Sequence, residues 1–215
     1  MAKPLQVHLD LRELVTIERP ALIGSRTSGR TYGITKGPKF NTDKLRPGRI
    51  LVVVKSKYQG LSSEIQITLG SGRGANRCIK VRYVSGITPD RLGRAAQAVS
   101  RTRGQKFTQH SQDEGSRVSG YVYEGAILAS IEDHLLEDAD AAVGVSEIEN
   151  IAATVIAHEL GHNLGLEHVT KRDDIMFEFA GHAKPRRVQW LNLAAKDRLA
   201  FSEAQLQQIR QILAS

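Results

Sequence analysis

One stretch decides both the fold and the chemistry of this 215-residue chain: His158-Glu159-Leu160-Gly161-His162-Asn163-Leu164-Gly165-Leu166-Glu167-His168. His158 and His162 are four residues apart, so their imidazoles lie on one face of a helix about one turn apart. Glu159 is rotated by about 100° from His158 on that helix, so it can lie beside a ligand that the histidines share. Gly165 is placed to end the helix with a positive φ, after which His168 can approach from another direction.

Three imidazoles with one open position are the ligand set of a catalytic zinc ion, because a structural site has a fourth protein ligand. The predicted metal ligands are therefore His158, His162 and His168, with one Zn²⁺ as cofactor. Zinc lowers the pKa of bound water to near 7, and Glu159 as general base completes the deprotonation. The alternative is a buried helix whose histidines only pack or hydrogen-bond, with no compensation for the burial of these polar groups.

This region resembles the metzincin zinc endopeptidases, whose signature is H-E-x-x-H-x-x-G-x-x-H followed by a methionine turn. Met176 lies eight residues after His168 in Asp173-Asp174-Ile175-Met176-Phe177. That short spacing is most similar to the matrixin (matrix metalloproteinase-like) branch. The resemblance implies that the histidines bind zinc and that Glu159 passes a proton from zinc-bound water to the leaving amine. It also implies that Gly165 and Met176 are structural supports, the methionine as an apolar floor beneath the ligands.

Two further segments extend the resemblance. Residues 201–209 are similar to the start of the matrixin C-terminal helix, and residues 125–129 are similar to the edge strand that aligns substrate. The chain departs from the family at Glu178, two residues after the methionine, where astacins have a tyrosine ligand and matrixins usually have proline. The edge strand implies three residues that contact an extended peptide: Ile127, Leu128 and Ala129.

Hydrophobic alternation and helix-start residues predict the remaining elements. Strands are predicted over 5–17, 49–58, 64–69 and 78–84, a strand-rich segment over 121–131, and loop or hairpin over 24–47. The motif Thr88-Pro89-Asp90 predicts a helix over 88–103, and a capping box of Ser146 and Glu149 predicts the start of the zinc-motif helix. A last helix is predicted from Ser202.

Together these elements predict an α+β fold. The expected architecture is a metzincin-like twisted mixed sheet with an active-site helix, a Met-turn and a C-terminal helix, preceded by a β-rich N-terminal extension. Two domains follow from this interpretation. Residues 1–75 form the basic extension, as a pro-segment, an extra layer of sheet or an accessory recognition module, and residues 76–215 form the catalytic domain.

The charge is divided unevenly along the chain. The net charge of +7 separates into +15 over residues 1–110 and −8 over residues 111–215. A basic half of this kind either recruits nucleic acid or another acidic partner, or packs against the acidic half and keeps the chain soluble. Because few aromatic residues lie among the basic ones, no base-stacking surface is evident, and nucleic acid is the second choice of partner.

Composition excludes several other classes. No apolar run is long enough to span a membrane, and a single cysteine excludes an intrachain disulfide framework. The N-terminus lacks the apolar core of a secretion signal, which favours the cytoplasm, with secretion as the alternative because most metzincins act outside cells. The acidic residues within 132–140 lack the spacing and glycine of a calcium loop, so Ca²⁺ is not supported as a second cofactor.

The predicted function is a zinc-dependent endopeptidase that hydrolyses extended peptides through a water activated by Glu159. The alternative is a basic protein that binds nucleic acid or an acidic partner on a metzincin-like scaffold, with little or no proteolysis. One tightly held zinc per chain favours the enzyme. Salt-dependent nucleic-acid binding that survives the loss of zinc favours the binding protein.

Overall fold

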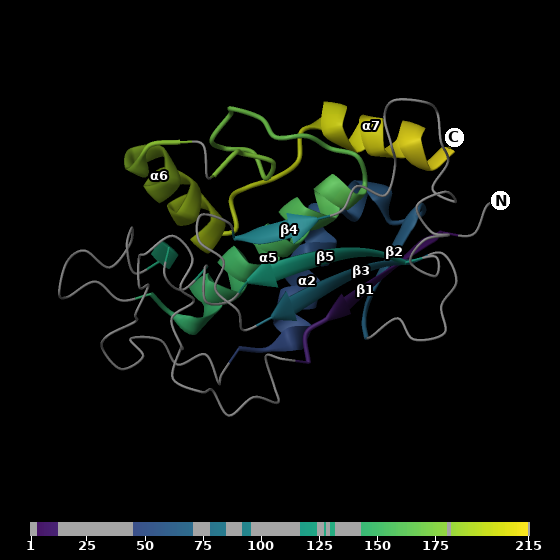
Figure 1. The fold of residues 1–215 in the computed structure, drawn as a ribbon, viewed down its shortest axis with the longest axis horizontal. Coiled ribbons are helices and arrows are strands. Elements are labelled where there is room, and N and C mark those ends of the chain that lie inside the picture. Colours follow the sequence, from purple (N-terminus) through teal and green to yellow (C-terminus); the bar gives the residue numbers. More distant parts are fainter. Residues whose placement is uncertain are drawn as a thin grey trace, which may run out of the picture.

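A mixed sheet lies at the centre of the computed structural model, with the strand order β2-β1-β3-β5-β4 (Figure 1). The strands β1 (Leu5–Asp10), β2 (Ile65–Leu69), β3 (Cys78–Val84) and β5 (Arg117–Tyr123) are parallel, and β4 (Gly93–Ala95) is antiparallel to β5. The structure describes residues 4–12, 45–70, 78–84, 92–95, 117–123, 127, 130–131, 143–179 and 182–214.

The register of the sheet follows from its apolar alternation. Leu5 pairs with Ile65 of β2, and Gln6 pairs with Cys78 of β3. In β1 the side chains of Val7 and Leu9 are fully buried, because alternate residues of a strand face the same side of the sheet. The strands predicted over 64–69 and 78–84 are confirmed, as is the first part of the strand predicted over 5–17.

Helix α2 (Pro47–Lys57) occupies most of the segment predicted as a strand over 49–58, so that prediction is wrong. Pro47 stands in the first turn, where the missing N–H has no helical partner to lose. Ile50, Val53 and Val54 are buried while Val52 is 58% exposed, which is the spacing of a helix face. The β-branched run suggested a strand, but burial of this face against α5 and β2 overrides that preference.

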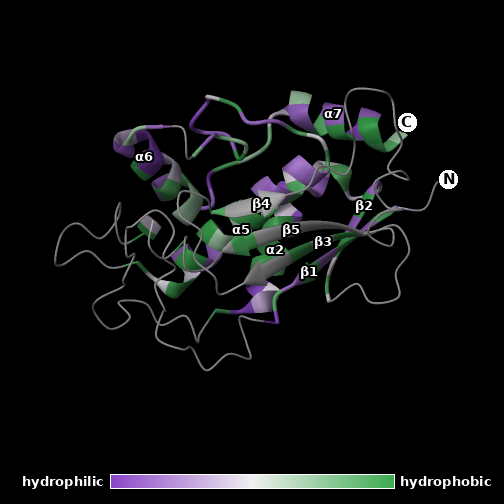
Figure 2. Cartoon of the chain, viewed as in Figure 1, coloured by the Kyte–Doolittle hydropathy of each residue, from purple (hydrophilic) through white to green (hydrophobic). Residues whose placement is uncertain are grey.

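Helix α5 (Val145–Asn163) carries the zinc motif and packs beside α2 against β3, β4 and β5 (Figure 1). The predicted helix is confirmed, but its capping box is not the predicted pair. Glu147 accepts a hydrogen bond from the Gly144 backbone N–H at 2.7 Å, and Glu149 instead binds Arg46. Figure 2 shows that α5 is largely apolar, which agrees with its nearly continuous burial.

Two predictions fail at the edge of the sheet next to α5. Residues 93–95 form strand β4 and not part of the helix predicted over 88–103, because backbone pairing with Gly120–Val122 of β5 outweighs the local helix signals. Ile127 is helical and fully buried, so the edge strand predicted over 125–129 is wrong at this residue. Leu128 and Ala129 lie outside the described residues.

The segment predicted as an N-terminal extension supplies part of the central sheet. Strand β1 lies between β2 and β3, and α2 packs on α5. A 3₁₀ turn (Gln59–Leu61) joins α2 to β2. Within residues 1–75 the structure thus describes two strands of the sheet, a helix and a 3₁₀ turn, and the division into domains at residue 75 stays a prediction.

Two helices follow the zinc motif. Helix α6 (Lys184–Ala195), which the sequence analysis did not predict, begins with Pro185 in its first turn and buries Trp190 and Leu191. Helix α7 (Glu203–Ala214) is the predicted last helix, and Ser202 and Gln205 exchange capping hydrogen bonds at its start. Among the described residues, no helix is long and apolar enough to cross a membrane. The acidic run over 132–140 and most of the loop predicted over 24–47 lie outside the described residues.

Candidate metal centre

The end of α5 brings the three histidines together. His158 and His162 lie on one face of this helix, which ends in a Schellman motif. The Leu166 N–H donates to the Gly161 carbonyl at 2.9 Å, and the Gly165 N–H donates to the His162 carbonyl at 3.0 Å. Gly165 has a φ of +88°, the conformation expected of a glycine that ends a helix, and the chain then returns toward α5 with His168.

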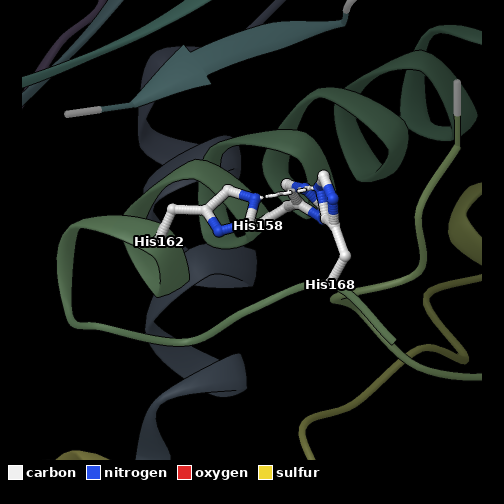
Figure 3. A group of neighbouring side chains, drawn as sticks. All are labelled: His158, His162 and His168. Carbon is white, nitrogen blue, oxygen red and sulfur yellow. Dashed lines mark hydrogen bonds between the residues drawn. The ribbon is translucent and has the colours of Figure 1, made fainter. Parts of the chain in front are cut away.

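The Nε2 atoms of the three imidazoles converge on one point (Figure 3). The Nε2–Nε2 distances are 3.1 Å between His158 and His162, 3.2 Å between His158 and His168, and 3.0 Å between His162 and His168. Two nitrogen ligands 2.0–2.1 Å from a tetrahedral zinc ion are about 3.3–3.4 Å apart. The triangle of nitrogen atoms is therefore close to the size that zinc requires.

The hydrogen bonds of two of these histidines show which ring nitrogen carries the proton. Nδ1–H of His158 donates to the Ile175 carbonyl at 2.7 Å, and Nδ1–H of His162 donates to the Leu166 carbonyl at 2.9 Å. Since a carbonyl only accepts, these Nδ1 atoms carry the proton and both Nε2 atoms present lone pairs. Two acceptors 3.1 Å apart repel each other unless a cation lies between them. The chain's own hydrogen bonds thus prepare a site for a metal ion.

Burial keeps these imidazoles neutral. Burial and the neighbouring charge of His162 lower the pKa of His158 to about 3. Burial also lowers the pKa of His162, although the hydrogen bond to the Leu166 carbonyl opposes this shift. The pKa of His168 is lowered by burial against the opposing charge of Glu178. A neutral imidazole is the form that binds metal, so the lowered pKa values favour binding over protonation.

The other predicted site residues lie around this cluster. Glu159 follows His158 in α5 and is 4% exposed, and Met176 is fully buried. A Cβ on Gly161 would lie 2.6 Å from the Met176 sulfur, so the glycine is needed for this close approach. The structure therefore brings Met176 against the helix that carries the histidines, whereas Ile127 belongs to another helical segment.

Several residues that support the centre were missed in the sequence analysis. Asp174 is 5% exposed, and its carboxylate accepts hydrogen bonds from the Met176 N–H at 2.8 Å and from Gln205 Nε2 at 3.1 Å. Trp190 Nε1–H donates to the Asp174 carbonyl at 3.0 Å. An aspartate two residues before the methionine was visible in the sequence, but its partners on α6 and α7 were not.

The site can be compared with known proteins. Residues 103–203 match the family model of matrixins. The resemblance to matrixins is thereby confirmed. The match includes all three histidines, Glu159 and Met176, and it supports a metallopeptidase-like hydrolase that acts on protein or peptide substrates, with a metal that is typically zinc. It gives no support to the alternative of a nucleic-acid-binding protein.

Two solved structures are similar to the chain at low identity. Archaemetzincin from Methanopyrus kandleri is 12% identical, with a TM-score of 0.47 over 99% of this chain and 97% of the other. Metalloproteinase-II from Bacteroides fragilis is 11% identical, with a TM-score of 0.47 over 99% of this chain and 54% of the other. No curated protein matches the sequence.

Proposed function

We propose that this protein is a zinc-dependent endopeptidase in which His158, His162 and His168 hold the ion. The observation that carries this proposal is the convergence of three Nε2 atoms within 3.2 Å of one another. In His158 and His162 the Nδ1–H donates to a carbonyl, so Nε2 has a free lone pair. Among the residues that the structure describes, this trio is the group that could hold a metal ion. With three protein ligands, a fourth position stays open for water or substrate.

The chemistry is divided between the ion and the chain. A zinc ion in this site supplies a Lewis acid that lowers the pKa of water and polarises a peptide carbonyl. Glu159, next to the first ligand, accepts the proton of the attacking water and donates it to the leaving amine. Met176 packs against Gly161 beneath the ligands and keeps the helix and the returning segment together.

Strand β4 replaces the segment 125–129 as the place where an extended substrate binds. It is the last strand in the sheet order, so its outer edge has no strand partner among the described residues, and it packs against α5. An edge strand presents backbone N–H and C=O groups that can pair with an extended peptide. We place the substrate backbone along this edge, beside the helix that carries the histidines.

The test combines metal content with peptide cleavage. The zinc-loaded protein should cleave members of a peptide library, and a chelator should abolish the cleavage. Glu159→Gln should retain zinc and lower kcat more than about 100-fold, since it removes the proton acceptor. Glu167→Gln is a matched control, because this carboxylate of the same motif is exposed and acts on His162 through its charge; its loss should leave kcat nearly unchanged. Undiminished cleavage by Glu159→Gln would contradict the mechanism.

A further inference from the structure

We infer that Asp174 is a positioning residue that holds the metal centre in place by tying the segment Ile175–Met176 to helix α7; this inference rests on the proposed zinc site. Asp174 is not one of the predicted ligands. Its carboxylate Oδ1 accepts two hydrogen bonds, from the backbone N–H of Met176 at 2.8 Å and from the amide Nε2 of Gln205 at 3.1 Å. The side chain is 5% exposed, so these bonds are formed away from water.

The segment that Asp174 holds reaches the metal centre by two contacts. The carbonyl of Ile175 accepts the Nδ1–H of His158 at 2.7 Å, and this bond sets the tautomer and the orientation of the ring. The sulfur of Met176 lies so close to α5 that a Cβ on Gly161 would be 2.6 Å away. A shift of residues 175 and 176 would therefore move the carbonyl that orients His158. It would also move the Met176 side chain that packs against α5 beneath the histidines.

The partner on α7 is itself fixed in orientation. Gln205 Oε1 accepts hydrogen bonds from the Ser202 backbone N–H at 2.7 Å and from the Ser202 hydroxyl at 3.1 Å. Because the amide oxygen faces these two donors, the amide NH₂ must face the Asp174 carboxylate. The cap that starts α7 thus also aims the donor that holds Asp174.

A third element completes the attachment. The indole N–H of Trp190, fully buried in α6, donates to the Asp174 backbone carbonyl at 3.0 Å. The backbone beside it is also held, since the Ile175 N–H donates to the Ala200 carbonyl at 3.4 Å. Both C-terminal helices are therefore linked to His158 through Asp174. On this inference, the part of the chain after His168 helps to position the metal ligands.

The experiment measures zinc affinity by competition with a chromophoric chelator, together with the visible absorption of the Co²⁺-substituted protein. Asp174→Ala should weaken zinc binding about 10–100-fold, which is the usual effect of removing a residue that supports a metal ligand from outside the coordination sphere. It should also alter the Co²⁺ spectrum. Asp174→Asn keeps an oxygen in the Oδ1 position and should restore most of the affinity and the wild-type spectrum. Gln205→Ala should weaken binding less than Asp174→Ala, and the two changes should not be additive.

The control is Glu149→Ala, at the other end of α5, which should lower stability without changing the Co²⁺ spectrum or the zinc affinity. Wild-type affinity and spectrum in a folded Asp174→Ala protein would overturn the inference, as would an Asp174→Asn protein that binds zinc as weakly as Asp174→Ala. If Asp174→Ala does not fold, unchanged affinity and spectrum in Gln205→Ala would overturn it instead. A wild-type protein that holds no zinc would contradict the proposed function. The zinc content of the wild-type protein therefore distinguishes failure of the proposed function from failure of the inference about Asp174.

Discussion

The two ends of helix α5 both bury polar side chains, but they satisfy them in opposite ways. At the N-terminal end the side chain of Glu149 is fully buried, and the guanidinium and backbone N–H of Arg46 surround it. At the C-terminal end three imidazoles turn their Nε2 atoms toward one another, with Nε2–Nε2 distances of 3.0 to 3.2 Å. The polar groups of the first end are satisfied within the chain, whereas those of the second end would be satisfied by the proposed zinc ion.

The pKa values express the same difference. Burial raises the pKa of Glu149, but hydrogen bonds and the charge of Arg46 outweigh this and lower it overall. Burial, together with the nearby charge of His162, lowers the pKa of His158 to about 3. A buried acid that stays ionised through its own partner indicates a structural role. Buried bases that stay neutral and aim their lone pairs at one point indicate a ligand site.

Removal of a ligand at the C-terminal end should have the largest effect. His162→Ala leaves two of three imidazoles, and we expect zinc affinity to fall more than about 100-fold, beyond the usual loss on changing an outer partner. Peptide cleavage should be lost with it. Titration against a competing chelator measures the affinity. His8→Ala is the control that should retain it, because His8 lies in strand β1, where its Nδ1 is 3.1 Å from Thr68 Oγ1. Equal zinc affinity in His162→Ala would remove the distinction between the two ends.

Removal of the acid at the N-terminal end should destabilise the fold without touching the metal. Glu149→Ala leaves Arg46 without its acceptor and opens a small cavity beside α2, so the free energy of unfolding should fall by about 2 kcal/mol. Chemical denaturation of the metal-free protein measures this change. Glu147→Ala, which removes only the exposed hydrogen bond to the Gly144 N–H, should cost less. A loss of zinc affinity in Glu149→Ala would show that the two ends are coupled.

The zinc motif was predictable because its information is local. The i, i+4 histidines, the glutamate between them and Gly165 all act within one helix and the turn that ends it. Helix α2 was predicted as a strand because the run Val52-Val53-Val54 consists of β-branched residues, which are typical of strands. Its helical period is visible only in the pattern of residues that are buried against the sheet and α5. Pro47, in the first turn, was the local signal that pointed to a helix.

The failures at the sheet edge and behind the site have another cause. Strand β4 is three residues long and exists because it pairs with β5, whose paired residues lie more than 20 positions later in the chain. The support of Asp174 comes from Trp190 and Gln205, 16 and 31 residues away. No pattern of spacing within one element reveals a contact of this kind, so the convergence of the three histidines could be predicted and the residues that support them could not.

The two ends of α5 should also differ in how they make the free energy of unfolding depend on pH. The pKa of His158 is about 3 in the folded protein and near 6.5 when unfolded, so the unfolded state binds more protons between these values. The free energy of unfolding of the metal-free protein should therefore fall as pH decreases below 6.5, by up to about 1.4 kcal/mol per pH unit from this histidine. The lowered pKa of Glu149 acts in the same direction, but only below pH 4.5.

Denaturation of the metal-free protein at pH 7.0 and 5.5 separates these contributions, because Glu149 stays ionised at both. His158→Gln should reduce the pH dependence, whereas Glu149→Ala should leave it unchanged over this range. Equal unfolding free energies of the wild-type protein at the two pH values would show that the histidines are not held neutral by burial. Added zinc should shift the loss of stability to lower pH, since the metal competes with protons for the same nitrogen atoms.

The smallest predicted effect concerns the turn that separates the ligands of α5 from His168. Gly165→Ala imposes a φ of +88° on an alanine and places its Cβ 2.8 Å from Ile212 Cδ1, so stability should fall by about 1 kcal/mol. Gly48→Ala is the matched control, because it lies in the first turn of α2 and its Cβ would meet no atom within 4 Å. This substitution should raise stability slightly, since alanine favours a helix over glycine. Thermal denaturation of the metal-free proteins therefore should give changes of opposite sign. A Gly165→Ala protein as stable as Gly48→Ala would show that the turn, and with it the approach of His168, does not depend on a left-handed glycine.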